Sequence, residues 1–360
     1  MLSKCCYNIS FDFIIVSLVF KLIGLYFMVI TGNINSICLI FLGLKGDLLL
    51  RTPIIETIKI KFPKVKITVV VDEGNQDIME NNPDIHNVLT VNRNKKNRFR
   101  HIKNMLTHIL ELRRKKFDVM INFYGGGSTS LIIFLVQAKY RIAFTHQKRA
   151  KYANNILIDP PKIPDGHSVA YISHLLTPLG IDPYSVRKGA SFYLSDSEKY
   201  HAEKKLERYS EDNIIAINLG AGAANKCWPV PFFIELSKQL HSKYKMIPLV
   251  FTNPGMENLT EDYLSGINGV IPVIKMPLSS FRRDAAIMEK CNVVVTGDTS
   301  LMHLSIALHK PTIAIFLNTE PKHVSPDEDW FIACDLRNNK SESGIDMVMQ
   351  AFHQLKNLIH

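Results

Sequence analysis

The sequence has few cysteines, and they are not arranged for metal binding. Its 360 residues include six cysteines. No two of them form a C-x-x-C pair, and no cluster of His and Cys has the spacing of a zinc site. This pattern argues against a disulfide framework and a thiolate metal site, and it favours reduced thiols in a cytosolic setting. The length suggests two domains, and hydrophobic and charged contents of 46% and 21% are typical of a folded globular protein.

Two sequence signatures of enzyme classes are also missing. Gly43-Leu44-Lys45-Gly46-Asp47 follows the first expected strand but is not G-x-G-x-x-G, which disfavours a dehydrogenase. Metal-dependent glycosyltransferases of the single-lobed class need a D-x-D after a strand. Asp327-Glu328-Asp329 has that spacing, but it lies late in the chain in an expected loop. We therefore expect neither a dehydrogenase nor a metal site at this triplet.

Acidic residues are scarce in the first half of the chain. Residues 31–190 hold 24 Lys and Arg against 12 Asp and Glu, while the whole chain has a net charge of +10. A basic half favours an acidic partner such as anionic lipid, a phosphorylated glycan or nucleic acid, although a merely solvated basic surface explains the charge equally well. The densest clusters, 93–103 and 113–116, have almost no interleaved aromatic residues, so we expect no nucleic-acid partner.

The longest apolar run lies at the N-terminus. Residues 13–30 are apolar except for Ser17 and Lys21. The run is barely long enough to span a bilayer, and a central Lys costs roughly 2.5–3.5 kcal/mol there. Three interpretations stay open: a membrane-associated helix, a weak signal anchor, or upstream sequence that is not translated, with Met28 as the start. The first and the last are favoured over a true span.

Alternating apolar runs and amphipathic stretches predict an α/β protein with two doubly wound parallel sheets. We expect an N-terminal extension (1–35), a first Rossmann-like domain (36–190), a second one (191–340) and a C-terminal helix (341–360). The expected strands are 37–42, 66–71, 87–91, 117–122, 139–143, 213–218, 246–251, 270–273, 292–296 and 312–316. The expected helices are 47–61, 75–81, 99–115, 128–137, 167–179, 195–210, 231–242, 279–290 and 342–359. Ligands of such sheets bind at the carboxyl ends of the strands.

Three loops fall at those carboxyl ends. The first holds Gly46 and Asp47, where capping of the next helix is an ordinary role for the Asp. The second, Asn218 to Gly222, is Gly-rich and is followed by Lys226, a combination that suits phosphate. The third holds Gly297-Asp298-Thr299-Ser300 between an apolar strand and a helix. The first amides of such a helix bind anions, although Asp and Ser are also ordinary N-caps.

With these loops in view, the chain resembles the ADP-heptose–lipopolysaccharide heptosyltransferases of glycosyltransferase family 9. The resemblance covers about residues 36 to 340, in order and at the expected spacing. It is carried by GDLLLRTP (46–53), ITVVVDEGNQDIMENNPDIHNVLTV (67–91), FDVMINFYGGGSTS (117–130), NLGAGAANKCWP (218–229) and VVVTGDTSLMHLSIALHKPTIAIF (293–316). The last motif together with K-x-W-P and GD…TP is highly specific.

The resemblance implies a two-lobed GT-B fold and an inverting, metal-independent transfer from a nucleotide-sugar donor, expected to be ADP-heptose. It implies a lipid A–core or related glycolipid acceptor, and a cytoplasmic enzyme peripherally associated with the anionic surface of the inner membrane. Asp47 matches the family's proposed catalytic base. The donor side comprises Lys226, Gly220, Ala221, Asp298, Thr299, Ser300, Met302 and His303. The acceptor-side candidates are Lys45, Gly46, Arg51, Gly125 and Gly126.

The chain departs from the family pattern at a few positions. Ser300 stands where Gly is usual, Arg51 where Thr is common, Phe41 where a basic residue is frequent, and Leu317-Asn318 where Phe-Gly is usual. These departures leave the donor sugar and the acceptor open. A non-catalytic glycan-binding or assembly protein is the alternative from another functional class. A chain that lacked the base or the phosphate-binding cation would have favoured this alternative. This chain has both residues, Asp47 and Lys226.

Overall fold

A computed structural model describes residues 30–93, 107, 109–162, 166–211, 213–338 and 344–358. The expectations for the apolar N-terminal run fall outside these residues, as does most of the helix expected at 99–115, of which 109–114 is helical. Among the described residues, none of the helices is both long and apolar enough to cross a bilayer.

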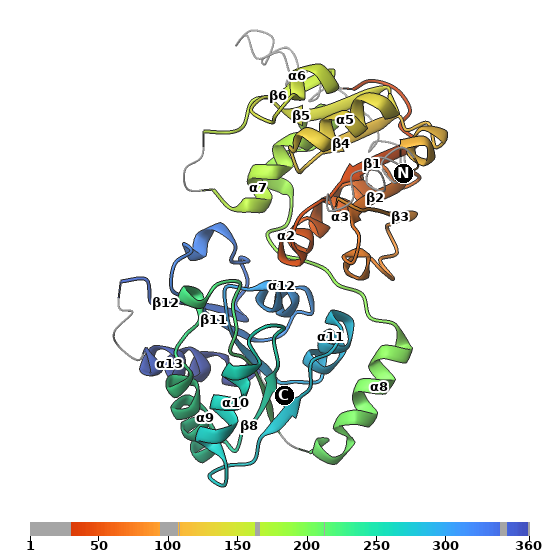
Figure 1. The fold of residues 1–360 in the computed structure, drawn as a ribbon. Coiled ribbons are helices and arrows are strands. Elements are labelled where there is room, and N and C mark those ends of the chain that lie inside the picture. Colours follow the sequence, from red (N-terminus) through yellow and green to blue (C-terminus); the bar gives the residue numbers. More distant parts are fainter. Residues whose placement is uncertain are drawn as a thin grey trace, which may run out of the picture.

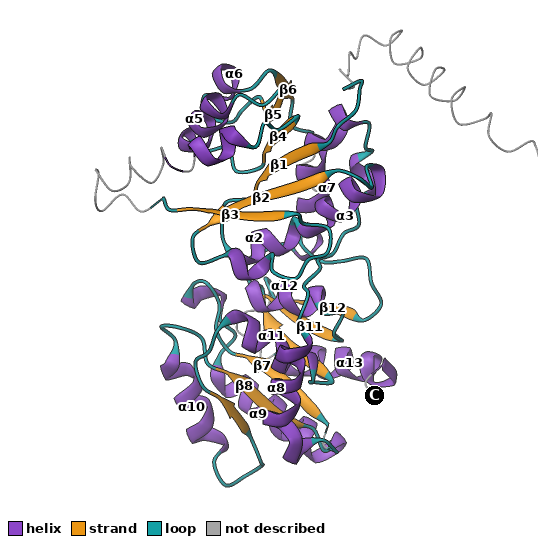
Figure 2. Ribbon diagram, turned by 90° about the vertical axis from the view of Figure 1, so that its right-hand side faces the viewer, coloured by secondary structure: helices purple, strands orange, loops and turns teal. Residues whose placement is uncertain are grey.

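Two parallel sheets of six strands each form the centres of two lobes (Figure 1 and Figure 2). The strands of the first sheet are β1 (Ser36–Ile40), β2 (Lys66–Asp72), β3 (Asn87–Val91), β4 (Val119–Asn122), β5 (Tyr140–Phe144) and β6 (Ile156–Ile158). The strands of the second are β7 (Ile214–Asn218), β8 (Ile247–Phe251), β9 (Ile274–Met276), β10 (Val293–Gly297), β11 (Thr312–Phe316) and β12 (Phe331–Asp335).

The two sheets have the same topology. Their strand orders are β3-β2-β1-β4-β5-β6 and β12-β11-β10-β7-β8-β9. Counted from each lobe's own first strand, both orders are 3-2-1-4-5-6, that of the dinucleotide-binding fold. The order reverses beside β1 in one lobe and beside β7 in the other, which is where crevices form in such sheets. The predicted pair of doubly wound α/β lobes is confirmed.

Helices cover both faces of each sheet (Figure 2). The α-helices are α2 (Lys45–Leu50), α3 (Thr52–Lys61), α5 (Gly127–Val136), α6 (Ala150–Ala153), α7 (Ser168–Ser173), α8 (Asp196–Leu206), α9 (Val230–Tyr244), α10 (Glu257–Ile267), α11 (Phe281–Glu289), α12 (Ser300–Ala307) and α13 (Ile345–Leu355). The 3₁₀ turns are η1 (Gln76–Ile78), η2 (His174–Leu179), η3 (Pro183–Ser185), η4 (Glu207–Tyr209), η5 (Ala224–Lys226), η6 (Pro321–His323) and η7 (Lys356–Leu358).

Several boundaries differ from the sequence prediction for local physical reasons. The helix expected over 47–61 is split at Arg51, because Pro53 cannot donate a backbone hydrogen bond and starts a new helix in its first turn. The strand expected at 270–273 begins only at Ile274, after Pro272, which has no backbone N–H to donate to a ladder. The helix expected at 75–81 is only the short η1.

The hydrophobic interior is continuous between the lobes. One buried cluster includes Ile37 and Leu39 of β1 together with Ala216 of β7 and Leu301 and Met302 of α12. The helices α2 and α12 meet where the lobes join, and both follow the carboxyl ends of central strands. The last helix, α13, packs its buried Val348 and Phe352 into the core of the second lobe.

Candidate active site

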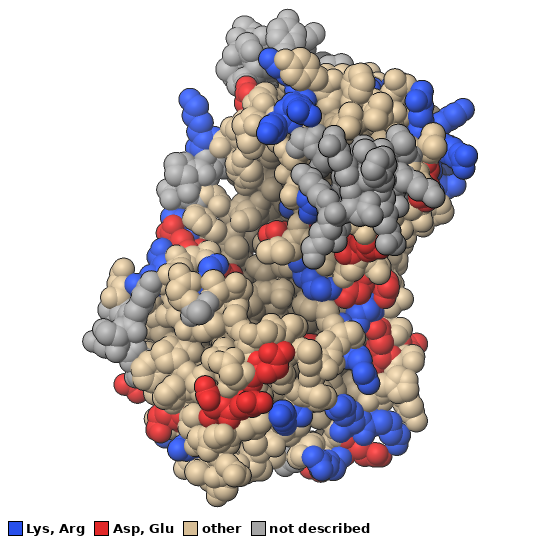
Figure 3. Space-filling view, in the orientation of Figure 1, with Lys and Arg blue, Asp and Glu red and all other residues tan. Residues whose placement is uncertain are grey.

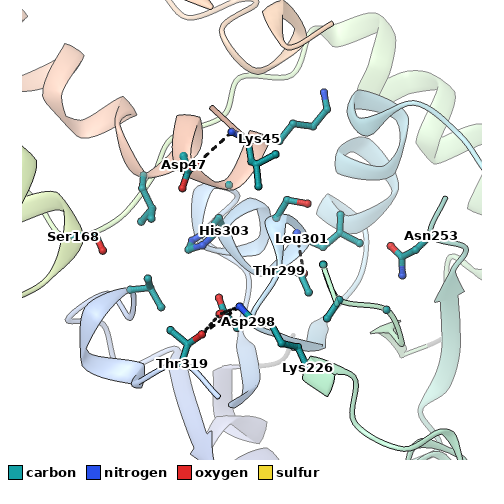
Figure 4. Close-up of a pocket in the computed structure, with 18 of the residues that line it drawn as sticks. Lys45, Asp47, Ser168, Lys226, Asn253, Asp298, Thr299, Leu301, His303 and Thr319 are labelled. Carbon is teal, nitrogen blue, oxygen red and sulfur yellow. Dashed lines mark hydrogen bonds and ion pairs between the residues drawn. The ribbon is translucent and has the colours of Figure 1, made fainter. Parts of the chain in front are cut away.

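The cleft between the lobes has a volume of about 690 Å³ and lies at the carboxyl ends of both sheets. Figure 3 shows a hollow between the two halves of the molecule, and Figure 4 shows the residues around the pocket. Its lining comes from the segments after β1, β7, β8, β10 and β11 and from helix α7. Asp47 and Lys226 both line it, so the predicted base and the predicted phosphate-binding cation share one opening. The lining residues predicted from sequence are Lys45, Gly46, Asp47, Arg51, Gly220, Ala221, Lys226, Asp298, Thr299, Ser300 and His303.

Asp47 is held at the start of α2. Its Oδ2 accepts a hydrogen bond from the backbone N–H of Leu44 at 3.3 Å, so the carboxylate also has the capping role that its position suggests. The side chain is exposed to the cleft. Within the described part of the chain, no hydrogen bond to its Oδ1 is found. One carboxylate oxygen is therefore available to accept a proton from a bound hydroxyl.

Gly46 lies where helix α2 of the first lobe packs closely against helix α12 of the second. A Cβ atom built on Gly46 would lie 2.9 Å from Cδ2 of His303 and 3.6 Å from Cα of Ser300. Any side chain there would push α2 away from the first turn of α12. The absence of a side chain at Gly46 thus sets the distance between Asp47 and the second lobe.

His303 is buried beneath Asp47 in the first turns of α12 (Figure 4). Burial lowers the pKa of His303 to about 4, although the nearby carboxylates of Asp298 and Asp47 oppose this shift. Its Nδ1 is buried without a hydrogen-bond partner among the described residues. The imidazole is therefore neutral near pH 7, and it can offer a hydrogen bond without adding positive charge.

Lys226 faces Asp298 and Thr319 across the floor of the cleft (Figure 4). Its Nζ lies 3.4 Å from Oδ2 of Asp298 and 3.5 Å from Oγ1 of Thr319, and that hydroxyl donates to the same Asp298 oxygen at 2.6 Å. The Lys226 side chain is about 38% exposed. A loosely held, partly exposed cation is suited to transfer its contact to a ligand phosphate.

The loop that carries Lys226 is anchored by an aromatic residue. Trp228 is buried, with its ring centroid 4.8 Å from that of Phe233 and 5.6 Å from that of Phe232. Pro229 then starts α9. The K-x-W-P sequence therefore fixes the backbone two residues from Lys226 and leaves the lysine side chain free to reach into the cleft.

The start of α12 is capped internally. The hydroxyl of Thr299 accepts hydrogen bonds from the N–H groups of Leu301 and Met302 at 3.1 and 3.4 Å. It also accepts from Nδ2 of Asn218 at 3.0 Å. The predicted capping role of Thr299 is thus present, and two of the amides expected to bind phosphate are engaged by it.

Asparagine residues organise the second-lobe loops. Asn253, directly after β8, donates from Nδ2 to Oδ1 of Asn218 at 2.6 Å. A Cβ atom on Gly220 would lie only 2.5 Å from that Nδ2, so the Gly-rich loop must pass close to Asn253. This contact brings the β7 and β8 loops together at the edge of the cleft.

The two basic acceptor-side candidates line the cleft but are already engaged. Nζ of Lys45 lies 2.6 Å from Oδ2 of Asp77 and 5.0 Å from the ring centre of Phe281 in the second lobe. Arg51 donates to the carbonyl of Leu42 at 2.7 Å. Burial lowers the pKa of Arg51, and the nearby carboxylate of Asp47 opposes this shift.

Three residues predicted from sequence do not line the cleft. Met302 is fully buried in the core and is not among the residues that line the cleft, so its expected packing near the nucleotide stays a prediction. Helix α12 presents this side of its first turn to the hydrophobic interior. Gly125 and Gly126 lie in the turn after β4, where Gly125 has a φ of 76° and a Cβ atom would meet Gln147. A tight turn explains these glycines, and the structure does not place them at the cleft.

Other residues were missed by the sequence reasoning. Asn253, Met256, Thr319 and Ser168 line the cleft. Asn253 could have been predicted, because it follows the expected strand 246–251, and the carboxyl ends of parallel strands lie at one edge of a sheet. Thr319 could have been predicted in the same way, because it follows the expected strand 312–316. Ser168 had no such signal, since its position depends on the long loop that precedes α7.

The late D-x-D triplet is not part of this site. Asp327 pairs with Lys188 at 2.8 Å and is exposed, and none of the three acidic residues of the triplet lines the cleft. Within the described residues, no group of three or more His, Cys, Asp or Glu is placed to hold a metal ion.

Comparison with known proteins gives one family. The model of glycosyltransferase family 9 (heptosyltransferase) matches residues 105–349. Lipopolysaccharide heptosyltransferase 3 of Escherichia coli is 24% identical over 284 residues, which cover 76% of this chain and 81% of that protein. The lipopolysaccharide core heptosyltransferase OpsX of Haemophilus influenzae is 18% identical over 81% of this chain and 82% of its own length.

Solved structures share the fold. The family 9 glycosyl transferase from Veillonella parvula superposes with a TM-score of 0.80 at 20% identity, covering 92% of this chain and 99% of that one. ADP-heptose lipopolysaccharide heptosyltransferase II of E. coli gives 0.73 at 16% identity, covering 90% and 98%. The E. coli heptosyltransferase WaaC, solved with ADP-2-deoxy-2-fluoro heptose, gives 0.70 at 18% identity, covering 89% and 99%.

Proposed function

We propose a reaction for this chain from one premise: it belongs to glycosyltransferase family 9, and it is therefore a glycosyltransferase. The proposed reaction moves a heptose or a related sugar from an ADP-activated donor to a lipopolysaccharide core or related glycolipid acceptor. The names of the relatives and the ADP-sugar bound in the WaaC structure support this choice of substrates. The observation that carries the proposal is the shared cleft, where Asp47 of the first lobe faces Lys226 of the second.

The cleft suits a single displacement with inversion. An acceptor hydroxyl attacks the anomeric carbon while the bond from that carbon to the diphosphate oxygen breaks. The proton of the hydroxyl passes to the carboxylate of Asp47, and the electron pair of the broken bond leaves with the diphosphate. Asp47 takes this role because it is exposed to the cleft and comes from the lobe opposite the donor side.

The second lobe stabilises the negative charge that develops on the leaving group. Lys226 moves from Asp298 toward the diphosphate, which exerts a stronger pull than a carboxylate already bonded to Thr319. A preorganised ammonium group stabilises negative charge as it develops, a task that a metal ion performs in other transferases. The proposed reaction therefore needs neither a metal nor a cofactor.

The test is a transfer assay with purified protein, ADP-heptose and a lipopolysaccharide core acceptor, with and without EDTA. We expect transfer in both conditions, with the anomeric configuration of the product opposite to that of the donor by NMR. Loss of turnover with EDTA would contradict the metal-independent mechanism. A retained configuration would contradict the single displacement.

Donor binding is tested separately by the thermal shift that ADP produces. We expect Lys226→Ala to weaken ADP binding by about tenfold or more, since it removes a charge-assisted contact. Lys243→Ala, an exposed lysine on α9, is the matched control and should bind ADP as the unmodified protein does. ADP binding without turnover on any glycan would favour the alternative of a non-catalytic glycan-binding protein.

A further inference from the structure

Helix α5 exposes apolar side chains on the outside of the first lobe. Its inner side packs Ile132, Ile133 and Val136 into the core. Its outer side presents Leu131 and Phe134, which are 39% and 52% exposed and lie three residues apart, on one face. The helix is thus apolar on its inner and outer sides, which is unusual for a helix facing water.

Neighbouring elements extend this exposed face. Tyr152 of α6 and Leu110 of the helical segment 109–114 are also exposed. Helix α6 is tied to α5, because Oγ of Ser130 donates to the carbonyl of Lys148 at 2.8 Å. The segment at 109–114 is tied to the end of α5 by Arg113 and Gln137 at 3.3 Å. Figure 1 and Figure 2 both show α5 and α6 side by side. Leu110, Leu131, Phe134 and Tyr152 are called the α5 surface below.

The rim of the α5 surface is basic. Residues 109–155 contain nine Lys and Arg but only two Asp and Glu. One of the two acidic residues, Asp118, accepts hydrogen bonds from the backbone of Asn35 and Ser36 and so belongs to another edge of the sheet. In Figure 3, blue atoms lie at the edges of the upper lobe and also on the lower lobe, whereas red atoms lie mostly at the waist and on the lower lobe.

We propose that the α5 surface docks on an anionic lipid bilayer. Apolar side chains that insert into the headgroup region, surrounded by lysine and arginine, are the combination that binds such membranes. A second copy of the chain fits less well, because two equally basic rims would repel each other. The inference builds on the proposed function only in taking the acceptor to be a membrane glycolipid.

The described N-terminal part of the chain lies away from this surface. Ile30 donates to the carbonyl of Pro178 at 2.8 Å and belongs to the core that contains Ile37 and Leu39 of β1. Helix α5 covers the opposite face of the first sheet, where Cys38 and Ile40 point. A chain leaving Ile30 starts on the far side of the sheet from α5.

Docking through α5 would bring the active-site cleft to the membrane. Helix α5 begins directly after the carboxyl end of β4, and the cleft lies at the carboxyl edge of the same sheet. A glycolipid whose acyl chains stay in the bilayer could therefore present its sugar to Asp47 without leaving the membrane.

The experiment measures binding of the full chain to vesicles by co-sedimentation, using phosphatidylcholine alone or with phosphatidylglycerol, without donor or acceptor. We expect binding only to the anionic vesicles, weakened by salt. Leu131→Ser with Phe134→Ser should lower the affinity by at least tenfold, and so should Lys148→Glu with Lys151→Glu. The matched controls on the second lobe, Val270→Ser with Leu278→Ser and Lys205→Glu with Lys243→Glu, should bind as the unmodified chain does.

Two results would overturn the inference. Equal binding by the α5 variants would place the contact elsewhere, including in residues 1–29. A dimer that the α5 substitutions dissociate would assign the surface to a second copy. Turnover on a core oligosaccharide without lipid should be unchanged in the α5 variants, which separates this inference from the proposed function. If no sugar is transferred by any variant while the vesicle results hold, the proposed function fails and the docking surface stands.

Discussion

The two lobes have sheets of the same strand order but differ at their carboxyl edges. In the first lobe, charged groups are tightly paired with one another, as in Lys45 with Asp77 at 2.6 Å and Arg93 with Asp72. In the second lobe, hydroxyl and amide groups predominate, and Lys226 makes only loose contacts. The shared framework fixes where the loops meet, whereas the loops themselves decide the chemistry.

Asp47→Asn is expected to have the largest effect, and it tests whether the two lobes have separate roles in the reaction. If the first lobe supplies the base and the second holds the donor, kcat should fall by about 10²–10⁴-fold, because the amide cannot accept the proton. The affinity for ADP should stay the same, as measured by titration calorimetry. Asp262→Asn, an exposed residue on α10, is the control. An unchanged kcat in Asp47→Asn would remove Asp47 from the chemistry.

The contact between the lobes can be broken at Arg282. This buried arginine of α11 donates to the carbonyls of Asp77 and Tyr193 at 2.7 Å and binds Glu198, holding the pKa of Glu198 at about 2. We expect Arg282→Gln to lower the free energy of unfolding by about 2–3 kcal/mol, since the partly buried carboxylate loses its partner. Urea denaturation measures this.

The control for Arg282 is another arginine that pairs with a carboxylate. Arg337 contacts Asp335 at 2.8 Å on the surface. Because water screens such a pair, Arg337→Gln should leave the urea midpoint unchanged. Equal effects of the two substitutions would show that Arg282 does not hold the lobes together.

Gly46→Ala tests the spacing between the lobes without replacing Asp47 or Lys226. Alanine favours a helix by about 1 kcal/mol over glycine, but its Cβ would contact His303 at 2.9 Å. We expect unchanged thermal stability and a fall in kcat/KM of about tenfold or more, because small displacements misalign reacting groups. Gly222→Ala, in the same cleft with nothing within 4 Å of its Cβ, should have full activity.

The pH dependence of stability concerns two buried histidines, one from each lobe. Burial lowers the pKa of both His167 and His303 to about 4. The unfolded chain takes up protons near pH 6.5 but the folded chain does not, so stability is complete above pH 6.5 and declines as the pH falls toward 4. Each should contribute about 1–3 kcal/mol to this loss.

Urea denaturation at several pH values tests the histidines. His167→Gln and His303→Gln should each remove part of the decline between pH 6.5 and 4, and the double substitution should remove most of it. His201→Gln, an exposed residue on α8, should leave the profile unchanged. A steep decline in the double variant would assign the pH dependence to other groups.

Much of the fold could be predicted because buried parallel strands read as continuous apolar runs. The missed elements lack that signal. β12 is the mixed sequence FIACD, β6 has only three residues, and α10 follows Pro254-Gly255 with a largely polar turn. The residues of the motif loops predicted the cleft. The inward orientation of the Met302 side chain and the contact of Asn253 with Gly220 could not be predicted, because both depend on the packing of neighbouring elements.

The shared interior has a consequence for how the chain is made. Leu301 and Met302 complete the same buried cluster as Ile37 and Leu39, although more than half of the sequence separates them. While a ribosome is still producing the second half, the first half has to leave part of its apolar surface in water, where it is open to chaperones and to aggregation. Newly made chains reach their native state only after synthesis is nearly finished.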